Sequence, residues 1–206
     1  MKKIPPYRLA TETNKSRRSK KRRPDPIQKA TMDLEAECRK QIAVLFSATA
    51  IALWRYWGKR KVTIGRLFDV ANEAFAECRS SLAYSMIQIC EKETGIELQN
   101  GEGKSWHEIP FLNAELDAGS FTPAKFLYMR KQQLPWVRPQ VFACILVAMH
   151  RKYGFGYVRC ARLYRQIQEV EEEFGASPEK LRTACLELTT LDVKTVLSDK
   201  KEEKTG

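Results

Sequence analysis

The chain has 206 residues, of which 43% are hydrophobic, and it carries a formal net charge of +11. This length allows one domain or two small ones, and the apolar content excludes a chain that is disordered throughout. The longest apolar run, Ile42 to Trp54, is too short to span a bilayer, which takes about 20 residues. Because the charged N-terminus has no secretory signal, we expect a cytoplasmic protein without a membrane partner.

The six cysteines and two histidines are scattered singly along the chain. Structural zinc sites need close Cys or His pairs, and secreted disulfide frameworks have denser cysteine spacing. Since neither pattern is present, we expect the cysteines to be small core residues in a reducing compartment. The sequence predicts no metal and no cofactor.

The first 26 residues form a basic arm. Positions 1–23 contain ten Lys or Arg and one acidic residue, so nine of the eleven net charges lie there. Four prolines and the lack of a hydrophobic period predict that the arm is disordered. Its candidate phosphate ligands are Arg17, Arg18, Lys20, Lys21, Arg22 and Arg23. Such cations release counterions when they bind nucleic acid, although a solubilising tail or a localisation signal is the alternative.

Two long helices are predicted after the arm. Apolar residues at three- and four-residue steps indicate the first helix over 32–57, with Thr31 or Asp33 as its N-cap. Gly58 is placed to end this helix in a left-handed turn. The second helix is expected over 63–94, and a serine pair within it marks a point where it could bend or break.

The junction between these helices mixes large rings with cations, namely Trp54, Arg55, Trp57, Lys59, Arg60 and Lys61. Rings that stack on bases beside cations that hold phosphates are typical of single-strand and RNA binding. The alternative is structural. The two tryptophans, three positions apart, would then share one helical face against the core while the lysines stay solvated.

Residues 96–121 have an irregular pattern and contain Gly103-Lys104-Ser105. A phosphate-binding P-loop needs a further glycine where this chain has Leu98, and a surrounding βαβ unit. His107 lies nearby, but no nucleophile or metal cluster completes a catalytic site. Because nothing in the chain converges on catalysis, we expect a non-enzymatic protein.

Prolines mark the predicted helix boundaries in the next segment. A short helix is predicted over 122–136, ended by Pro135, and a new helix over 139–153, begun by Pro139. A further helix is expected over 157–174.

This last helix carries a basic stripe at three-residue steps, Arg159, Arg162 and Arg165. The stripe could follow a phosphate backbone, or it could pair with the acidic run at 169–173 or with the 63–94 helix. Gly175 then stops the helix, and Ser177-Pro178 starts a final one.

Residues 46–77 and 142–173 align without a gap and share nine identities, among them Gly58/Gly154 and Arg66/Arg162. This internal similarity predicts an all-α bundle of about five to seven helices, built from two repeated αα-hairpins. The predicted parts are the arm 1–26, a first hairpin 27–95, a connector 96–136, a second hairpin with a C-terminal helix 137–191, and a charged tail 192–206.

Residues 153–159, YGFGYVR, resemble an FGFGxxR-type motif of small uncharacterised proteins from bacteriophages and mobile elements of Gram-positive bacteria. The first copy, WGKR at 57–60, departs from it because Arg60 replaces the second glycine. The resemblance implies a phage protein acting in a bacterial host cell. Small proteins in that context often bind host machinery, including as inhibitors of CRISPR nucleases.

Two functional hypotheses follow. The first is a non-enzymatic protein that binds nucleic acid or a nucleoprotein complex through the arm and the aromatic-basic turns. The second is an anti-CRISPR-like inhibitor that binds a host RNA-guided nuclease directly. A helix-turn-helix is less consistent with the sequence, because the predicted second helix is too long for a recognition helix. The oligomeric state is open.

Overall fold

The computed structural model describes residues 26–80, 85–100, 102–108 and 123–193. Within these ranges the chain is all-α, as predicted, and its only extended pairing is one isolated bridge between Gln99 and Ser105. The helices are α1 (Pro26–Trp57), α2 (Lys61–Ser80), α3 (Ser85–Thr94), the 3-10 helix η1 (Trp106–Glu108), α4 (Pro123–Tyr153), α5 (Tyr157–Glu173) and α6 (Pro178–Thr189). Nearly all of the predicted arm and tail lies outside the described residues.

Helix α1 is built on the longest apolar run, and all of residues 44–53 are buried. It begins at Pro26, so the predicted later start and the N-cap at Thr31 or Asp33 are wrong. The Thr31 hydroxyl donates to the backbone carbonyl of Ile27 at 2.9 Å, inside the helix, instead of capping a helix end. No described helix is long and apolar enough to cross a membrane.

The helix predicted over 63–94 is two helices, α2 and α3. Helix α2 ends at Ser80, the first serine of the pair that marks the weak point in the sequence. Both helices pack against α4.

Helix α4 runs through Pro135 and Pro139, so the predicted break between two shorter helices is wrong. A proline inside a helix removes a backbone hydrogen bond and costs about 3 kcal/mol or more. Burial offsets this cost, because Trp136 is only 3% exposed and residues 141–149 are all buried. Each large apolar side chain buried contributes about 1.5–3 kcal/mol. Tertiary packing therefore outweighs the local preference.

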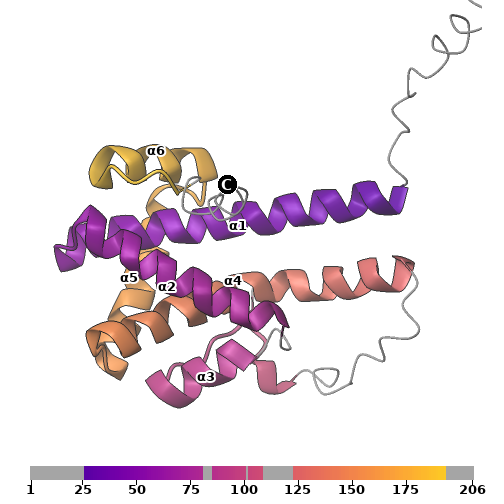
Figure 1. Cartoon of the computed structure of the whole chain (residues 1–206), viewed down its shortest axis with the longest axis horizontal. Helices are drawn as coiled ribbons and strands as arrows, with labels where there is room; N and C mark the ends of the chain where they lie inside the picture. Colours follow the sequence, from indigo (N-terminus) through magenta and orange to yellow (C-terminus); the bar gives the residue numbers. More distant parts are fainter. Residues whose placement is uncertain (1–25, 81–84, 101, 109–122, 194–206) are drawn as a thin grey trace, which may run out of the picture.

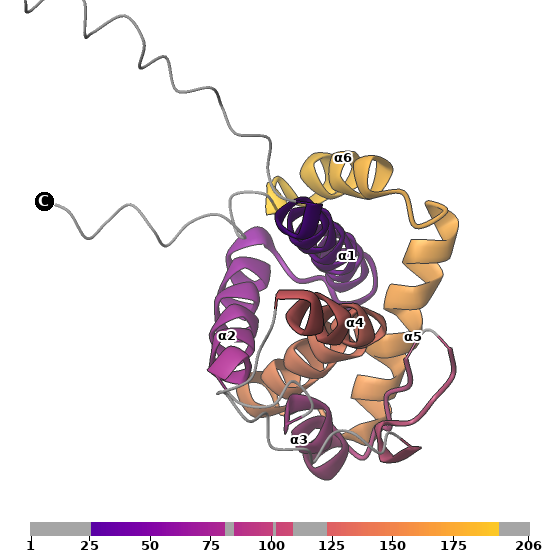
Figure 2. The same ribbon diagram turned by 90° about the vertical axis from the view of Figure 1, so that its right-hand side faces the viewer.

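Helices α1 and α4 lie side by side in the same direction at the centre of the fold (Figures 1 and 2). The other helices are exchanged between the halves of the chain: α5 and α6 pack on α1, whereas α2 and α3 pack on α4. Contacts between α1 and α2, and between α4 and α5, are few. One continuous core results, which each half completes for the other.

The ends of α3 and α6 are also built alike. The Thr94 hydroxyl donates to the backbone carbonyl one turn earlier at 2.7 Å and accepts the N–H two residues later at 3.3 Å. The Thr189 hydroxyl makes the same two bonds at 2.7 and 3.2 Å. The next residues, Gly95 and Thr190, both have left-handed φ values, +72° and +58°. The two halves of the chain therefore resemble each other at the end of their third helix as well. An origin by duplication stays a prediction.

Candidate nucleic-acid interface

Two glycine turns end α1 and α4 in the same way. Gly58 and Gly154 have φ values of +60° and +64°, which favour glycine, so the predicted stop at Gly58 is confirmed and the aligned Gly154 ends α4 in the same way. In each turn the next residue, Lys59 or Phe155, donates its N–H to the carbonyl six positions back, at 3.0 and 3.4 Å. This is the Schellman pattern of a helix end. Both turns lie at the same end of the molecule, on the left in Figure 1.

The two turns meet because α1 and α4 are parallel neighbours. The Trp57 ring lies against Phe155, with centroids 4.7 Å apart, and its Nε1–H donates to the Gln166 side chain at 2.8 Å. The Lys59 ammonium lies over the Tyr153 ring, 5.5 Å from its centroid. Residues that are far apart in the sequence therefore form one surface.

We call this surface, formed by residues 54–62 and 152–162, the turn face. It exposes five large apolar side chains, Trp54, Tyr56, Val62, Tyr157 and Val158, which are 41–68% accessible. It also exposes five cations, Arg60, Lys61, Lys152, Arg159 and Arg162. None of these five forms an ion pair with a described residue. Aromatic rings and unneutralised cations thus alternate over both turns.

The two predicted tryptophans have different environments. Trp57 is half-buried and packs on the core, whereas Trp54 is 41% exposed. Tyr56 is also exposed, but two residues along a helix turn the side chain by about 200°, so Trp54 and Tyr56 point to different sides. The end of α1 is therefore no continuous stacking row. The structure adds Tyr157 from the other half, which lies beside Gly95.

Arg55 is held in an ion pair and does not point freely toward a ligand. Its guanidinium donates two hydrogen bonds to Glu173, at 2.5 and 3.1 Å. These bonds hold the pKa of the Glu173 carboxyl below its usual range. Arg151, the equivalent residue of the second half, binds Glu93 in the same way at 2.5 and 2.9 Å. Both arginines therefore hold the end of their own helix to another helix. Because its guanidinium is already paired, Arg55 is a poor candidate for a phosphate ligand.

The predicted basic stripe on α5 is exposed but not uniform. Arg159 lies over the Phe155 ring, 5.9 Å from its centroid, and Arg165 pairs with Glu169 at 3.6 Å. Arg162 completes the stripe between them. The two interpretations of the stripe therefore apply to different residues. Arg159 and Arg162 belong to the turn face, whereas Arg165 pairs within its own helix. The arm candidates, Arg17 to Arg23, lie outside the described residues.

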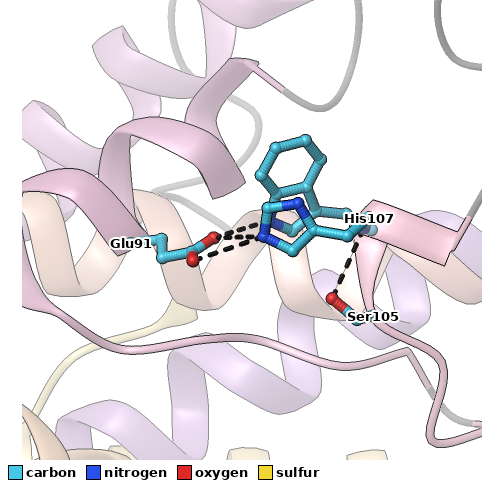
Figure 3. Close-up of polar contacts among 4 residues, drawn as sticks. Glu91, Ser105 and His107 are labelled. Atoms are coloured by element: carbon cyan, nitrogen blue, oxygen red, sulfur yellow. Dashed lines mark hydrogen bonds and ion pairs between the residues drawn. The ribbon is translucent and has the colours of Figure 1, made fainter.

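A second polar cluster lies in the segment after α3 (Figure 3). The Trp106 Nε1–H donates to Glu91 at 2.7 Å, and the His107 Nε2 lies 3.2 and 3.3 Å from the two Glu91 oxygens. The Ser105 hydroxyl accepts the backbone N–H of His107 at 3.4 Å, so it does not meet the imidazole. A serine activated by a histidine needs a bond between those two side chains. The cluster therefore fastens η1 to α3.

The Gly103-Lys104-Ser105 sequence forms a tight turn without a phosphate cradle. The Asn100 side-chain oxygen accepts the N–H groups of Glu102 and Lys104, both at 2.9 Å. The Lys104 ammonium pairs with Glu102 at 2.8 Å. Because a side chain of the protein already occupies these N–H groups, the turn is not arranged for a nucleotide.

The described residues contain no group of three or more metal-ligating side chains. Four of the five described cysteines are buried, and burial raises the pKa of the Cys90 and Cys160 thiols to about 11. Such thiols stay protonated and unreactive near neutral pH.

The sequence reasoning missed several residues of the turn face, above all Val62, Val158, Tyr157 and Lys152. The two valines are an aligned identical pair, and a valine inside a helical pattern is normally assigned to the core. Each valine is the second residue of its helix, α2 or α5, and lies four positions after the glycine that ends the preceding helix. This position is the signal that could have indicated exposure. Searches of protein families, curated proteins and solved structures find no match to this chain.

Proposed function

We propose that the protein binds nucleic acid or a nucleoprotein complex through the turn face, with the basic arm adding affinity. The observation that carries the proposal is the meeting of the two turns, which gathers five cations without carboxylate partners beside exposed rings. Cations hold phosphates by releasing counterions, and exposed rings stack on unpaired bases. The arm contributes nine further net charges.

The function can be tested by fluorescence anisotropy with a labelled 20-nucleotide strand and a matching duplex, each titrated across a salt series. In the variant with Arg60→Gln and Lys61→Gln, we expect weaker binding and a smaller salt slope. Each lost phosphate contact should reduce the slope of log K against log salt by about 0.7–0.9. The matched control is Lys180→Gln, which changes an exposed lysine outside the turn face. It should leave both the affinity and the salt slope close to their wild-type values.

The ring contribution is tested separately with Tyr157→Ala. If Tyr157 stacks on a base, single-strand affinity should fall by about 1–3 kcal/mol with an unchanged salt slope. Wild-type affinity in both turn-face variants, with unchanged melting temperatures, would exclude the turn face as the contact.

An inhibitor of a host RNA-guided nuclease is the second candidate, favoured by one observation. The five exposed apolar side chains include two tyrosines and a tryptophan beside arginines, and such residues dominate protein interfaces. The phage context implied by residues 153–159 fits the same reading. Binding to a guide-loaded nuclease in the absence of target DNA, lost on Tyr157→Ala, would support this candidate over the first.

A further inference from the structure

Tyr157 is an exposed ring of the turn face that a second helix holds in place. A Cβ atom at Gly95, the residue directly after α3, would lie 3.3 Å from Cδ2 and 3.9 Å from Cε2 of this ring. The ring therefore lies against the bare glycine, while 60% of Tyr157 stays accessible to solvent. One edge of the ring is supported by the protein, and much of the rest is free for a ligand.

The contact with Tyr157 gives position 95 its own reason for a glycine. The helix end alone does not require one, because Thr190 adopts the corresponding left-handed conformation after α6 with a φ of +58°. At Gly95 a side chain would crowd the ring at 3.3 Å, which is closer than ordinary van der Waals contact. A ring supported in this way is preorganised, and less conformational entropy is lost when a ligand stacks on it.

The two turns present different chemistry at aligned positions of the same backbone. Arg60 aligns with Gly156, and Lys61 aligns with Tyr157. The first turn therefore offers cations where the second offers a supported ring. A nucleic-acid strand that lies over both turns would place phosphates on the first turn and a base on the second.

Carboxylates limit the cationic surface along both helices that leave the turns. The exposed charges are basic at the start of α2 and α5 and acidic further on, at Asp69 and Glu73 in α2 and at Glu169, Glu172 and Glu173 in α5. From Lys61 to Asp69 the rise along α2 is about 12 Å, at 1.5 Å per residue. From Arg159 to Glu169 the rise along α5 is about 15 Å. One turn of duplex is about 34 Å long, so a duplex that follows either helix would bring its phosphates against these carboxylates.

We infer that the turn face is specific for unpaired nucleotides: it stacks a base on Tyr157 and holds the neighbouring phosphates with its cations. The inference rests on the proposed function and adds the substrate class, which is single strands and loops instead of duplex. Inside a duplex each base is stacked between its neighbours and offers no free face to a ring. Single-stranded RNA and DNA share the chemistry that this surface recognises, and the test contains both.

The test compares four ligands of full-length protein by fluorescence anisotropy and competition. Two are 12-nucleotide strands, one of deoxythymidine and one of uridine. The third is a strand of 12 deoxyribose phosphates without bases, which keeps the charge and removes the stacking partner. The fourth is a relaxed, closed duplex circle, which has no ends on which a ring could stack.

Tyr157→Leu keeps an apolar side chain but removes the ring. We expect it to weaken binding to at least one of the two base-bearing strands by about fivefold or more. Its affinity for the base-free strand and for the duplex circle should equal that of wild-type protein. Because the arm is identical in both proteins, its contribution cancels in each of these comparisons.

Two variants serve as controls. Tyr157→Phe keeps the ring and should bind all four ligands as wild type does. Tyr128→Leu removes a tyrosine that is 64% exposed on α4, about 38 Å along the helix from Tyr153, and should also have no effect. Since both tyrosines are exposed, all three variants should melt at the wild-type temperature.

The outcomes separate this inference from the proposed function. If wild-type protein binds none of the four ligands, the proposed function fails. If Tyr157→Leu weakens all four ligands equally or none of them, while Arg60→Gln with Lys61→Gln still weakens binding, specificity for unpaired nucleotides is overturned and the proposed function stands. A selective loss for either base-bearing strand supports the inference, and the strand with the larger loss identifies the preferred sugar.

Discussion

At the scale of single residues, Thr49 is the one buried side chain of the described residues whose polar atom has no hydrogen-bond partner. It is 0% exposed and lies in the core run of α1. The aligned residue in the second half is Ile145, which places no hydroxyl in the core. A buried polar group left unsatisfied costs about 1–3 kcal/mol.

We therefore expect Thr49→Val, which replaces the hydroxyl with a methyl of similar size, to raise the free energy of unfolding by about 1 kcal/mol. Urea denaturation followed by circular dichroism measures the change. Thr189→Val is the matched control, because the Thr189 hydroxyl makes two hydrogen bonds and its loss should destabilise by about 1–2 kcal/mol. Equal effects of the two substitutions would contradict the assignment.

At the scale of helices, α4 keeps two prolines that its own backbone does not favour. Pro135 is half-buried in the helix interior, whereas Pro178 opens α6, where its missing N–H has no intrahelical acceptor to lose. The two positions make a matched pair for one substitution.

Pro135→Ala should restore a helical hydrogen bond and raise the unfolding free energy by about 1–2 kcal/mol, part of the proline penalty being offset by unfolded-state entropy. Pro178→Ala should leave the free energy of unfolding unchanged or lower it slightly. Thermal melting of both variants gives the comparison. A loss of stability in Pro135→Ala would show that the proline shapes α4 in a way that alanine cannot replace.

These helices also show what sequence could predict. The ends of α1 and α4, the start of α6 and the bounds of α5 were predictable, because glycine and proline act locally there. The break at Pro135 was wrongly predicted because the opposing term, burial of residues 141–149, depends on partners elsewhere in the chain. Within the candidate site, the pairing of Arg55 with Glu173, 118 positions away, could not be derived from spacing. The spacing of apolar residues shows which face of a helix is buried, but it does not show which other helix covers that face.

At the scale of the whole molecule, the exchange of helices makes the two halves one unit. Helix α6 packs on α1 and α3 packs on α4, so neither half encloses a core with its own helices alone.

Cutting the chain at a protease site inserted within 109–122 should therefore leave the halves associated. We expect one 1:1 complex in gel filtration, with the circular dichroism of the uncut protein. The pieces should separate only in denaturant. The same site inserted at the tail, after residue 194, is the control for the insertion itself. Two independent folded fragments after cleavage would contradict the exchange.

The exchange of helices also means that, during synthesis, α1 is made long before the helix α6 that covers part of it. Helix α1 is complete at residue 57, but its cover α6 is complete only at residue 189. A ribosome adding about 5–20 residues per second needs roughly 7–26 s for the 132 residues between these points. Over that interval the part of α1 that α6 covers has left the ribosome and has not gained its native partner. We therefore expect the nascent chain to depend more strongly on chaperones when its second half is translated more slowly.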